Sequence, residues 1–400
     1  MFFRCSLHSV RTKGFITIMS YEKIISDNKE WIDGVWAKLD AKLSKTAVKS
    51  RNKLPSTSVN GVHNDCSEKN VQNWTNGFWG GLMWLMYEAT KNEDYKLTAQ
   101  KSEELMDECF KNVDQLHHDV GFMWHILAGA NYRITGDMAA RNKNIFCAMS
   151  LASRYDATGN YIRSWNGKWQ NEDNNGWTII DCMMNIPLLH WASKEIDDTR
   201  FKKIAVRYAD MAMRDHVRPD GSVNHIVVHD PDQPDTVLGT KGGQGYGVGS
   251  CWSRGASWAL YGFALAYINT GDAKYLDTAK KVAHYFITNL EMNGWKALCD
   301  FRSPETPVIY DSSAMAIAAC GMIEIAKNVP EYEKDIYLNA AIKTLKALDA
   351  EFCDYGEDED SIVLKGTVMY THGHHVPLVY ADYFYTEAIL KLKGSEFLLW

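Results

Sequence analysis

Two aspartates occupy positions where a sequence can place acid–base chemistry. Asp119 follows two histidines in the segment HHDVGF, where a loop leads into an apolar run. Asp181 lies inside the run GWTIIDCMMN, among isoleucine, cysteine and methionine, where an ionised carboxylate is costly to bury; this suits a proton donor. Together they predict a general acid–base pair. The structural alternatives are a helix N-cap for Asp119 and a carboxylate satisfied by a neighbouring helix end for Asp181.

Tryptophan and tyrosine are abundant, at 14 and 20 residues. A large aromatic core is one explanation, and stacking of flat rings on sugar faces is the other. Trp165 lies in the polar loop RSWN, where a core role is hard to justify, so sugar stacking is favoured there. Trp74 and Trp79 enter the first apolar helix, and Trp177 precedes Asp181; for Trp74 and Trp79 both explanations stay open.

A glycine-rich approach, GGQGYGVGS, carries Gln244 and leads to Arg254 in an otherwise apolar segment. No lysine–serine pair follows the glycines, so a phosphate loop is not indicated. A guanidinium in an apolar helix needs an anionic partner. That partner is either an internal acid or the carboxylate of a substrate, which arginine binds with two parallel hydrogen bonds.

Histidines cluster at His117-His118 and in the segment HGHH at 372–375. Neither cluster has the histidine pair at i, i+4 with a glutamate that a zinc helix requires, so no metal or other cofactor is predicted. His225 follows the turn PDGS at 219–222; on its own it is expected to be a surface or packing residue.

Helical periodicity runs through most of the chain, and strand signals are few. An apolar helix repeatedly ends in a short polar turn and is followed by a charged, amphipathic helix such as Asp277–Asn289. Glycine or asparagine is expected to end the first helix and an acidic residue to cap the second. The apolar helices are predicted at Phe78–Ala89, Phe122–Tyr132, Trp177–Ala192 with a possible kink at Pro187, Ala256–Ile268, Ala314–Ala326 and Leu378–Leu392.

Six apolar helices and six amphipathic partners, with Tyr21–Leu43 as the opening outer helix, predict an all-α, closed double ring, an (α/α)6 barrel. No proline- or glycine-rich linker divides the chain, so residues 20–400 are expected to form one domain. The long loops 159–175, 220–250 and 300–310 all follow outer helices, which places them at one mouth of the ring. The functional site is expected there.

Composition excludes several classes of protein. A formal net charge of −7 argues against a general nucleic-acid binder. No apolar stretch is long enough to span a membrane, and residues 1–19 lack the apolar core of a signal peptide. Those residues are expected to be a disordered extension, with Met19 as an alternative start. Nine cysteines without paired spacing indicate reduced thiols, and hence a cytoplasmic protein.

The motifs resemble those of one family. The segment HDVGF at 118–122, the run from Trp177 to Asn185, Gln244 ahead of WSRG at 252–255, and DYFYTEA at 382–388 are similar to the unsaturated glucuronyl hydrolases of glycoside hydrolase family 88. Their order and approximate spacing hold from Trp74 to the end of the chain. The resemblance implies the (α/α)6 barrel that the helix count predicts independently.

The resemblance also implies an unusual reaction on unsaturated glycosaminoglycan disaccharides. Members of the family hydrate the C4=C5 double bond of a terminal 4,5-unsaturated uronic acid, and the glycosidic bond is then lost by rearrangement. Asp181 matches the general acid/base, and Asp119 matches a second essential carboxylate that contacts substrate hydroxyls. The remaining implied positions bind or stack on the sugar: Trp74, His118, Trp165, Trp177, His225, Gln244, Arg254, Trp258 and Tyr370.

The chain departs from the family pattern at two places. Some members have histidine where this chain has Gly243. Some also carry a serine, serine and lysine cluster that favours sulfated substrates; alignment through Gly366 places Met369, His372 and His374 there. A weak preference for sulfated substrates is therefore expected.

Two other functions compete with this interpretation. An unsaturated rhamnogalacturonyl hydrolase would share the fold and the acid/base aspartate, but Asp119 and its neighbour His118 favour the glucuronyl type. A non-catalytic carbohydrate-binding protein would keep the aromatic residues without needing Asp181 in an apolar segment.

Overall fold

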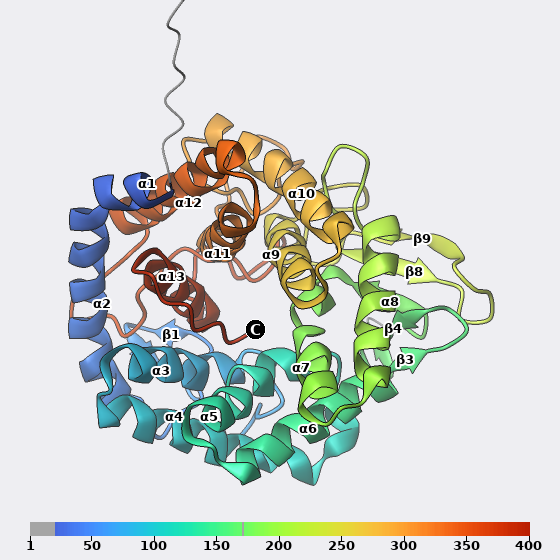
Figure 1. The fold of residues 1–400 in the computed structure, drawn as a ribbon, viewed down its shortest axis with the longest axis horizontal. Coiled ribbons are helices and arrows are strands. Elements are labelled where there is room, and N and C mark those ends of the chain that lie inside the picture. Colours follow the sequence, from blue (N-terminus) through green and yellow to red (C-terminus); the bar gives the residue numbers. More distant parts are fainter. Residues whose placement is uncertain (1–20, 170–171) are drawn as a thin grey trace, which may run out of the picture.

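The computed structural model describes residues 21–169 and 172–400, and the predicted extension at residues 1–19 lies outside them. Within these residues the helices form two concentric rings, with six positions in the inner ring and six in the outer ring (Figure 1). The predicted (α/α)6 barrel is therefore confirmed. The helix α13 packs against both α3 and α11 and closes the inner ring. No helix within the described residues is long and apolar enough to cross a membrane.

The inner ring contains α3 (Asn76–Thr90), η3 with α5 (Gly121–His125 and Ala128–Thr135), η4 with α7 (Ile180–Met184 and Pro187–Glu195), α9 (Ser253–Thr270), α11 (Ser312–Asn328) and α13 (Val379–Leu392). The outer ring contains α1 (Tyr21–Asp27) and α2 (Lys29–Lys49), α4 (Glu93–Met106), α6 (Met138–Ser153), α8 (Thr199–Asp215), α10 (Ala273–Met292) and α12 (Glu331–Glu351). Two short 3-10 turns, η1 (Asp107–Lys111) and η2 (Val113–Gln115), follow α4.

Hydrophobic pattern decides which ring a helix joins. In α11, every residue from Ser312 to Ala326 is buried, because neighbours surround the helix on all sides. The outer helix α8 instead buries a single stripe, with Phe201, Ala205, Tyr208 and Ala212 at helical spacing. The predicted division into apolar inner and amphipathic outer helices is therefore confirmed in these two examples.

The short turns between inner and outer helices have the predicted chemistry. Gly136 and Gly271 end their inner helices in the left-handed conformation, which glycine adopts without steric cost. The side chains of Asp137, Asp198 and Asp272 each accept a backbone N–H at the start of the following outer helix. These caps fix where each outer helix begins.

Two of the predicted inner helices are wrong as continuous elements. In place of Phe122–Tyr132, a π-helical turn, η3, precedes α5, because the Asn185 side chain accepts the backbone N–H of Phe122 at 2.8 Å. In place of Trp177–Ala192, a strand and the 3-10 turn η4 precede α7. Pro187 has no N–H to donate, so it starts α7 and does not kink a longer helix.

The strands lie mainly in the long loops at the predicted mouth. A three-stranded antiparallel sheet pairs β7 (Trp177–Ile179) with β8 (Ile226–His229) and β8 with β9 (Val237–Lys241); Ile179 is opposite Ile226. It projects from the side of the ring beside α8 (Figure 1). The two-stranded pairs are β1 (Ser58–Val59) with β2 (Val62–His63), β3 (Tyr155–Asp156) with β4 (Tyr161–Ile162), and β5 (Lys168–Trp169) with β6 (Glu172–Asp173).

Aromatic side chains fill the axis of the barrel. Trp400 lies at the centre of the ring in Figure 1, stacks on Phe384 with ring centroids 5.7 Å apart, and donates from its indole nitrogen to Glu387 at 3.0 Å. Phe122 packs against Trp400 at 5.8 Å and against Trp74 at 5.3 Å. Phe122 therefore connects the aromatic core on the barrel axis with Trp74, a tryptophan predicted for the site.

A buried carboxyl on α13 makes stability depend on pH. Asp382 accepts backbone N–H groups from Ile362 at 3.1 Å and Val363 at 2.6 Å, and burial raises its pKa to about 7. Its pKa in an unfolded chain is about 3.9. The folded state therefore holds this proton more tightly. Protonated Asp382 therefore stabilises the folded state fully below pH ~4, and this contribution to the free energy of unfolding is lost as pH rises through about 7.

We expect the replacement Asp382→Asn, which keeps an acceptor oxygen, to remove this loss. The free energy of unfolding of the natural protein, relative to that of the variant, should fall by an amount on the order of 4 kcal/mol between pH 4 and pH 8. Chemical denaturation of both proteins across this range measures it. Parallel curves for the two proteins would contradict the assignment.

Candidate active site

The two predicted carboxylates are brought together by an asparagine. Asp181 lies in η4, directly after β7, and Asp119 lies just before η3. The side-chain nitrogen of Asn185 donates to Asp119 Oδ1 at 3.1 Å and to the backbone oxygen of Asp181 at 3.3 Å. The breaks in the two inner helices therefore place both aspartates at the same end of the barrel.

Asp119 faces two histidines and does not cap a helix with its side chain. Its Oδ2 lies 3.3 Å from His117 Nδ1 and 3.4 Å from His118 Nε2. Burial lowers the pKa of His118 to about 4, so this ring is neutral at pH 7. Burial pushes the pKa of Asp119 upward, but His118 and the hydrogen bonds from His117 and Asn185 outweigh it, and the pKa lies below its usual value. Asp119 is therefore an anion at neutral pH.

Asp181 faces His225, which directly precedes β8, the strand that pairs with β7. Oδ2 of Asp181 lies 3.4 Å from Nε2 of His225, and the backbone N–H of Ile180 donates to the backbone oxygen of His225 at 3.1 Å. Asp181 Oδ2 is buried without a hydrogen bond. The structural alternative, a carboxylate satisfied by a helix end, is therefore not what the structure contains. His225, expected on its own to be a surface or packing residue, is instead buried beside the acid.

Arg254 has an internal acidic partner that the sequence did not identify. One terminal guanidinium nitrogen lies 2.7 Å from Asp311 Oδ2 and also contacts the Thr367 carbonyl, while the other donates to the Val368 carbonyl at 2.7 Å. The arginine is 1% exposed. The internal alternative considered for Arg254 is thus present, and of its nitrogens Nε alone remains buried without a partner.

Aromatic rings line the same end of the barrel. Trp165 and Trp177 meet edge to face at 6.3 Å, and Trp165 lies 6.5 Å from the His118 ring. On another side, Trp74 packs against Tyr380 at 4.9 Å. Trp74 and Trp165 are half-buried, as expected for residues that can stack on a sugar.

Trp258 does not reach the surface of the site. It is fully buried and packs against Phe122 at 5.0 Å and Phe384 at 5.4 Å, in the aromatic core of the barrel.

The two remaining predicted residues, Gln244 and Tyr370, lie next to each other. Gln244 donates from its side chain to the Val368 carbonyl at 2.8 Å, and its own backbone oxygen accepts from the Tyr370 N–H at 2.8 Å.

Several buried polar atoms of the site have no hydrogen-bond partner among the described residues. Such atoms are rare in folded proteins unless a ligand or water satisfies them. In this region they include both ring nitrogens of His118, Oδ2 of Asp181, Nε2 of His225, Nε of Arg254 and the indole nitrogens of Trp252 and Trp258. Such a group of polar atoms near Asp181, beside half-buried tryptophans, is typical of a site for a polar ligand.

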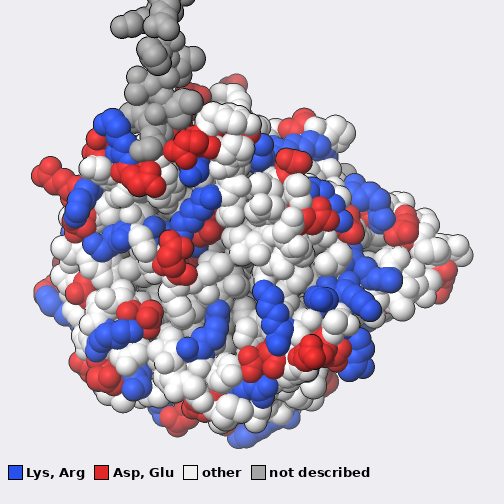
Figure 2. Space-filling model, viewed as in Figure 1, with Lys and Arg blue, Asp and Glu red and all other residues white. Residues whose placement is uncertain are grey.

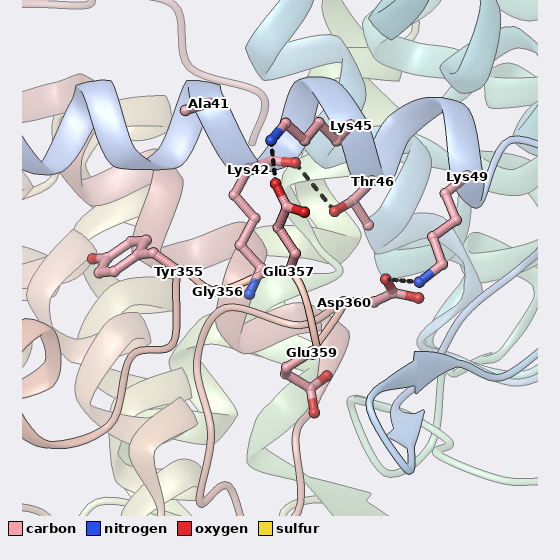
Figure 3. Close-up of a pocket in the computed structure, with 10 residues that line it drawn as sticks. All are labelled: Ala41, Lys42, Lys45, Thr46, Lys49, Tyr355, Gly356, Glu357, Glu359 and Asp360. Atoms are coloured by element: carbon pink, nitrogen blue, oxygen red, sulfur yellow. Dashed lines mark hydrogen bonds and ion pairs between the residues drawn. The ribbon is translucent and has the colours of Figure 1, made fainter.

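Charged side chains away from these residues are paired in the pocket and intermixed on the face that the figures show. A pocket of about 270 Å³ between α2 and residues 355–360 is lined by lysines, but Lys45 pairs with Glu357 at 2.5 Å and Lys49 with Asp360 at 2.7 Å (Figure 3). None of the predicted site residues lines it. The face drawn in Figure 2 intermixes positive and negative side chains without a large basic patch.

One group of described residues has the donor types of a metal site. The ligand atoms of His117, His118 and Asp119 lie within 4.8 Å of one another. This trio offers two imidazoles and one carboxylate, and in the structure both rings face the same carboxylate oxygen. The chemistry considered below uses Asp119 as an acceptor of hydrogen bonds and needs no metal.

The chain matches a family model described as Glycosyl Hydrolase Family 88 over residues 46–397. It is also 36% identical over 343 residues to the unsaturated glucuronyl hydrolase of Bacillus sp. (strain GL1), covering 82% of this chain and 89% of that protein. The chain belongs to glycoside hydrolase family 88. The predicted family is confirmed, and with it the prediction that the protein is a glycoside hydrolase.

Other members of the family are similar over comparable lengths. The unsaturated chondroitin disaccharide hydrolase of Streptococcus pneumoniae is 33% identical, over 82% of this chain and 83% of that protein. The crystal structure of the Bacillus sp. GL1 enzyme superposes with a TM-score of 0.82 at 31% identity, covering 90% and 97% of the two chains. The structure of an unsaturated glucuronyl hydrolase specific for heparin also gives 0.82, at 28% identity over 91% and 97%.

Reasoning from the sequence missed four residues of the site. Asn185 holds both aspartates, Asp311 pairs with Arg254, Trp252 packs on His225 with ring centroids 4.3 Å apart, and Tyr380 packs on Trp74. Asn185 and Trp252 stand inside the motifs that carried the resemblance, so proximity in sequence could have found them. Asp311 and Tyr380 are distant in sequence from their partners and carried no such signal.

Proposed function

We propose that this enzyme releases a 4,5-unsaturated uronic acid from the non-reducing end of glycosaminoglycan disaccharides that a polysaccharide lyase has produced. The observation that carries the proposal is the group of unpartnered buried polar atoms around Asp181, next to the half-buried Trp74 and Trp165. The relatives named unsaturated glucuronyl and unsaturated chondroitin disaccharide hydrolases support it.

The proposed chemistry gives each aspartate its own role. Asp181 donates a proton to C4 of the unsaturated ring and takes one from the water that adds to C5. The hemiketal so formed opens, and the glycosidic bond is lost without attack at the anomeric carbon. Asp119, an anion with its pKa below the usual value, accepts hydrogen bonds from the substrate hydroxyls.

The remaining polar groups are proposed to hold the uronate. These groups are His118, His225, Gln244 and Arg254, and the Nε of Arg254 is the guanidinium atom still free to donate. Trp74, Trp165, Trp177 and Tyr370 are proposed to stack on the two sugar rings. Trp258, being fully buried, is proposed to act only by supporting Phe122.

We also propose that the enzyme works in the cytoplasm. Eight cysteines lie in the described part of the chain and all of them are free thiols, as expected in a reducing compartment. Its proposed partners are small anionic disaccharides and neither nucleic acid nor membrane.

The proposed substrate class is tested by ultraviolet absorbance, which is lost when the conjugated double bond is hydrated. The protein is incubated with unsaturated disaccharides from chondroitin, hyaluronan and heparin, and with an unsaturated rhamnogalacturonan disaccharide. We expect absorbance loss with at least one glycosaminoglycan disaccharide. Turnover of the rhamnogalacturonan substrate alone would move the enzyme to the alternative activity, and binding without loss would support a non-catalytic role.

Sulfate selectivity is expected to be weak and to depend on pH. The hairpin that carries Met369, His372 and His374 offers no lysine at these positions. His374 Nε2 donates to the Tyr370 carbonyl at 2.8 Å, which leaves His372, exposed at the hairpin tip, as the freer ring. A protonated imidazole carries a positive charge and binds a sulfate group better than a neutral one does. The ratio of kcat/KM for 6-sulfated over unsulfated unsaturated chondroitin disaccharide should therefore rise as pH falls from 8 to 6.

The variants His372→Ala and His374→Ala are expected to flatten that rise, with the larger effect at His372. His375→Ala is the matched control, because His375 lies in the same hairpin and accepts the backbone N–H of Tyr310 through Nε2. A strong sulfate preference that does not change with pH would place the anion contact elsewhere.

A further inference from the structure

Gly243 lies against the ring of His225. Its φ of +59° is in the left-handed region, and a Cβ added to it would stand 2.1 Å from His225 Nδ1 and 2.7 Å from Cε1. Real Cβ atoms do not approach other atoms this closely, so any other residue at 243 must displace something. Some members of the family have histidine here, but with the backbone conformation of this chain glycine is what permits the contact between the loop 242–249 and His225.

Packed side chains restrict the movement of the His225 ring. On its other side it packs on Trp252, with ring centroids 4.3 Å apart and planes inclined by 44°. The Trp252 ring is itself covered by the Arg254 guanidinium at 4.5 Å, and both residues are buried. Arg254 is in turn fixed by Asp311. A side chain at position 243 would therefore turn or shift the His225 ring within its own site.

The contact with the loop decides which nitrogen of His225 carries the proton. The backbone N–H of Gln244 points at His225 Nδ1 over 3.0 Å. A backbone amide can only donate, so Nδ1 must accept, and in the neutral ring the hydrogen is on Nε2. Nε2 is the atom that lies 3.4 Å from Asp181 Oδ2. Catalytic hydrogen bonds are often this long before substrate is bound.

We propose that Gly243 is a positioning residue for the acid/base Asp181, acting through His225. By allowing the Gln244 N–H to reach Nδ1, it keeps the Nε2–H of His225 directed at Oδ2 of Asp181. Oδ2 then accepts from the histidine, and Oδ1 is left to carry the proton that goes to the substrate. The inference rests on the proposed function, because it assigns Asp181 its part in the reaction.

The variant Gly243→Ala tests the proposal against Gly249→Ala. Gly249 lies in the same glycine-rich loop with a φ of +77°, but a Cβ there meets nothing within 4 Å. The control variant therefore has similar backbone strain, but its added methyl group does not contact His225. We expect Gly243→Ala to lower kcat about 10²-fold, as a misplaced catalytic group does, with a much smaller change in KM. Gly249→Ala should stay near the natural enzyme.

Nitrogen NMR of the histidine rings gives a readout that does not depend on turnover. In protein labelled with ¹⁵N-histidine, His225, assigned by comparison with His225→Gln, is expected to show its hydrogen on Nε2. In Gly243→Ala this pattern should change, and in Gly249→Ala it should not.

Either of two results overturns the proposal: a His225 ring that carries its hydrogen on Nδ1 in the natural protein, or kcat values that match in the two glycine variants. The first of these results overturns the proposal even if Gly243→Ala fails to fold, because it is measured on the natural protein. A natural protein that turns over no unsaturated disaccharide contradicts the proposed function instead.

Discussion

Replacing Asp181 with asparagine is expected to lower kcat/KM on an unsaturated disaccharide by roughly 10²–10⁴-fold, the contribution of a general acid/base. Asparagine keeps the shape of the side chain but has no proton to transfer to C4. Folding should survive, because the contact of Asp181 Oδ2 with His225 is 3.4 Å long and is not a hydrogen bond before substrate is bound, so the change removes no bond that holds the fold. Steady-state kinetics with thermal unfolding of the same samples measures both effects.

The matched control for this change is Asp382→Asn. Asp382 is also a buried aspartate of the inner ring, on α13, but its carboxylate accepts backbone N–H groups from Ile362 and Val363. Its replacement should alter the pH dependence of stability and leave kcat/KM near normal at pH 6. If Asp181→Asn turned over at a near-normal rate, Asp181 would not be the acid/base.

Replacing Arg254 with alanine is expected to have a large effect on stability as well as on activity. The change leaves Asp311, fully buried, without its cationic partner, and breaking a buried ion pair in this way costs about 3–5 kcal/mol of unfolding free energy. Arg254→Lys should also be damaging, because a single ammonium group cannot reach Asp311 and the carbonyls of Thr367 and Val368 together. Chemical denaturation measures the stability of each variant.

A double variant separates the structural role of Arg254 from its proposed role with substrate. In Arg254→Met with Asp311→Asn, both buried charges are removed, so most of the lost stability should return. If Arg254 also binds the uronate, KM should stay raised by about 10–100-fold, the value of a hydrogen bond to a charged group. A stable double variant with the KM of the natural enzyme would show that Arg254 only holds the structure together.

The fold could be predicted because it depends on patterns that repeat. Inner helices such as α11 are buried on all sides, and turns such as those at Gly136 and Gly271 carry their own caps, so the periodicity was enough to count the ring. The two broken inner helices could not be predicted in the same way. Their breaks depend on the side chain of Asn185 reaching Phe122 and on β7 pairing with β8, which are contacts between distant segments.

Candidate site residues could be predicted where they lie within a short sequence motif. The motifs that contain Asp119, Asp181 and Arg254 were found because acidic and basic residues are unusual in apolar segments. The pairing of Asp181 with His225 and of Arg254 with Asp311 was not predicted, since His225 and Asp311 come from other loops. Trp258 was predicted as a pocket residue from its position one turn after Arg254, and that position does not reveal that its ring packs against Phe122 and Phe384.

The central claim is that the enzyme needs the C4=C5 double bond of its substrate. It is tested most directly by comparing an unsaturated chondroitin disaccharide with the saturated disaccharide of the same two sugars, and measuring released hexosamine together with ultraviolet absorbance. We predict that the unsaturated sugar loses its absorbance and releases one hexosamine for each double bond lost, while the saturated sugar is untouched. Release of hexosamine from both at similar rates would place the attack at the anomeric carbon and contradict the account.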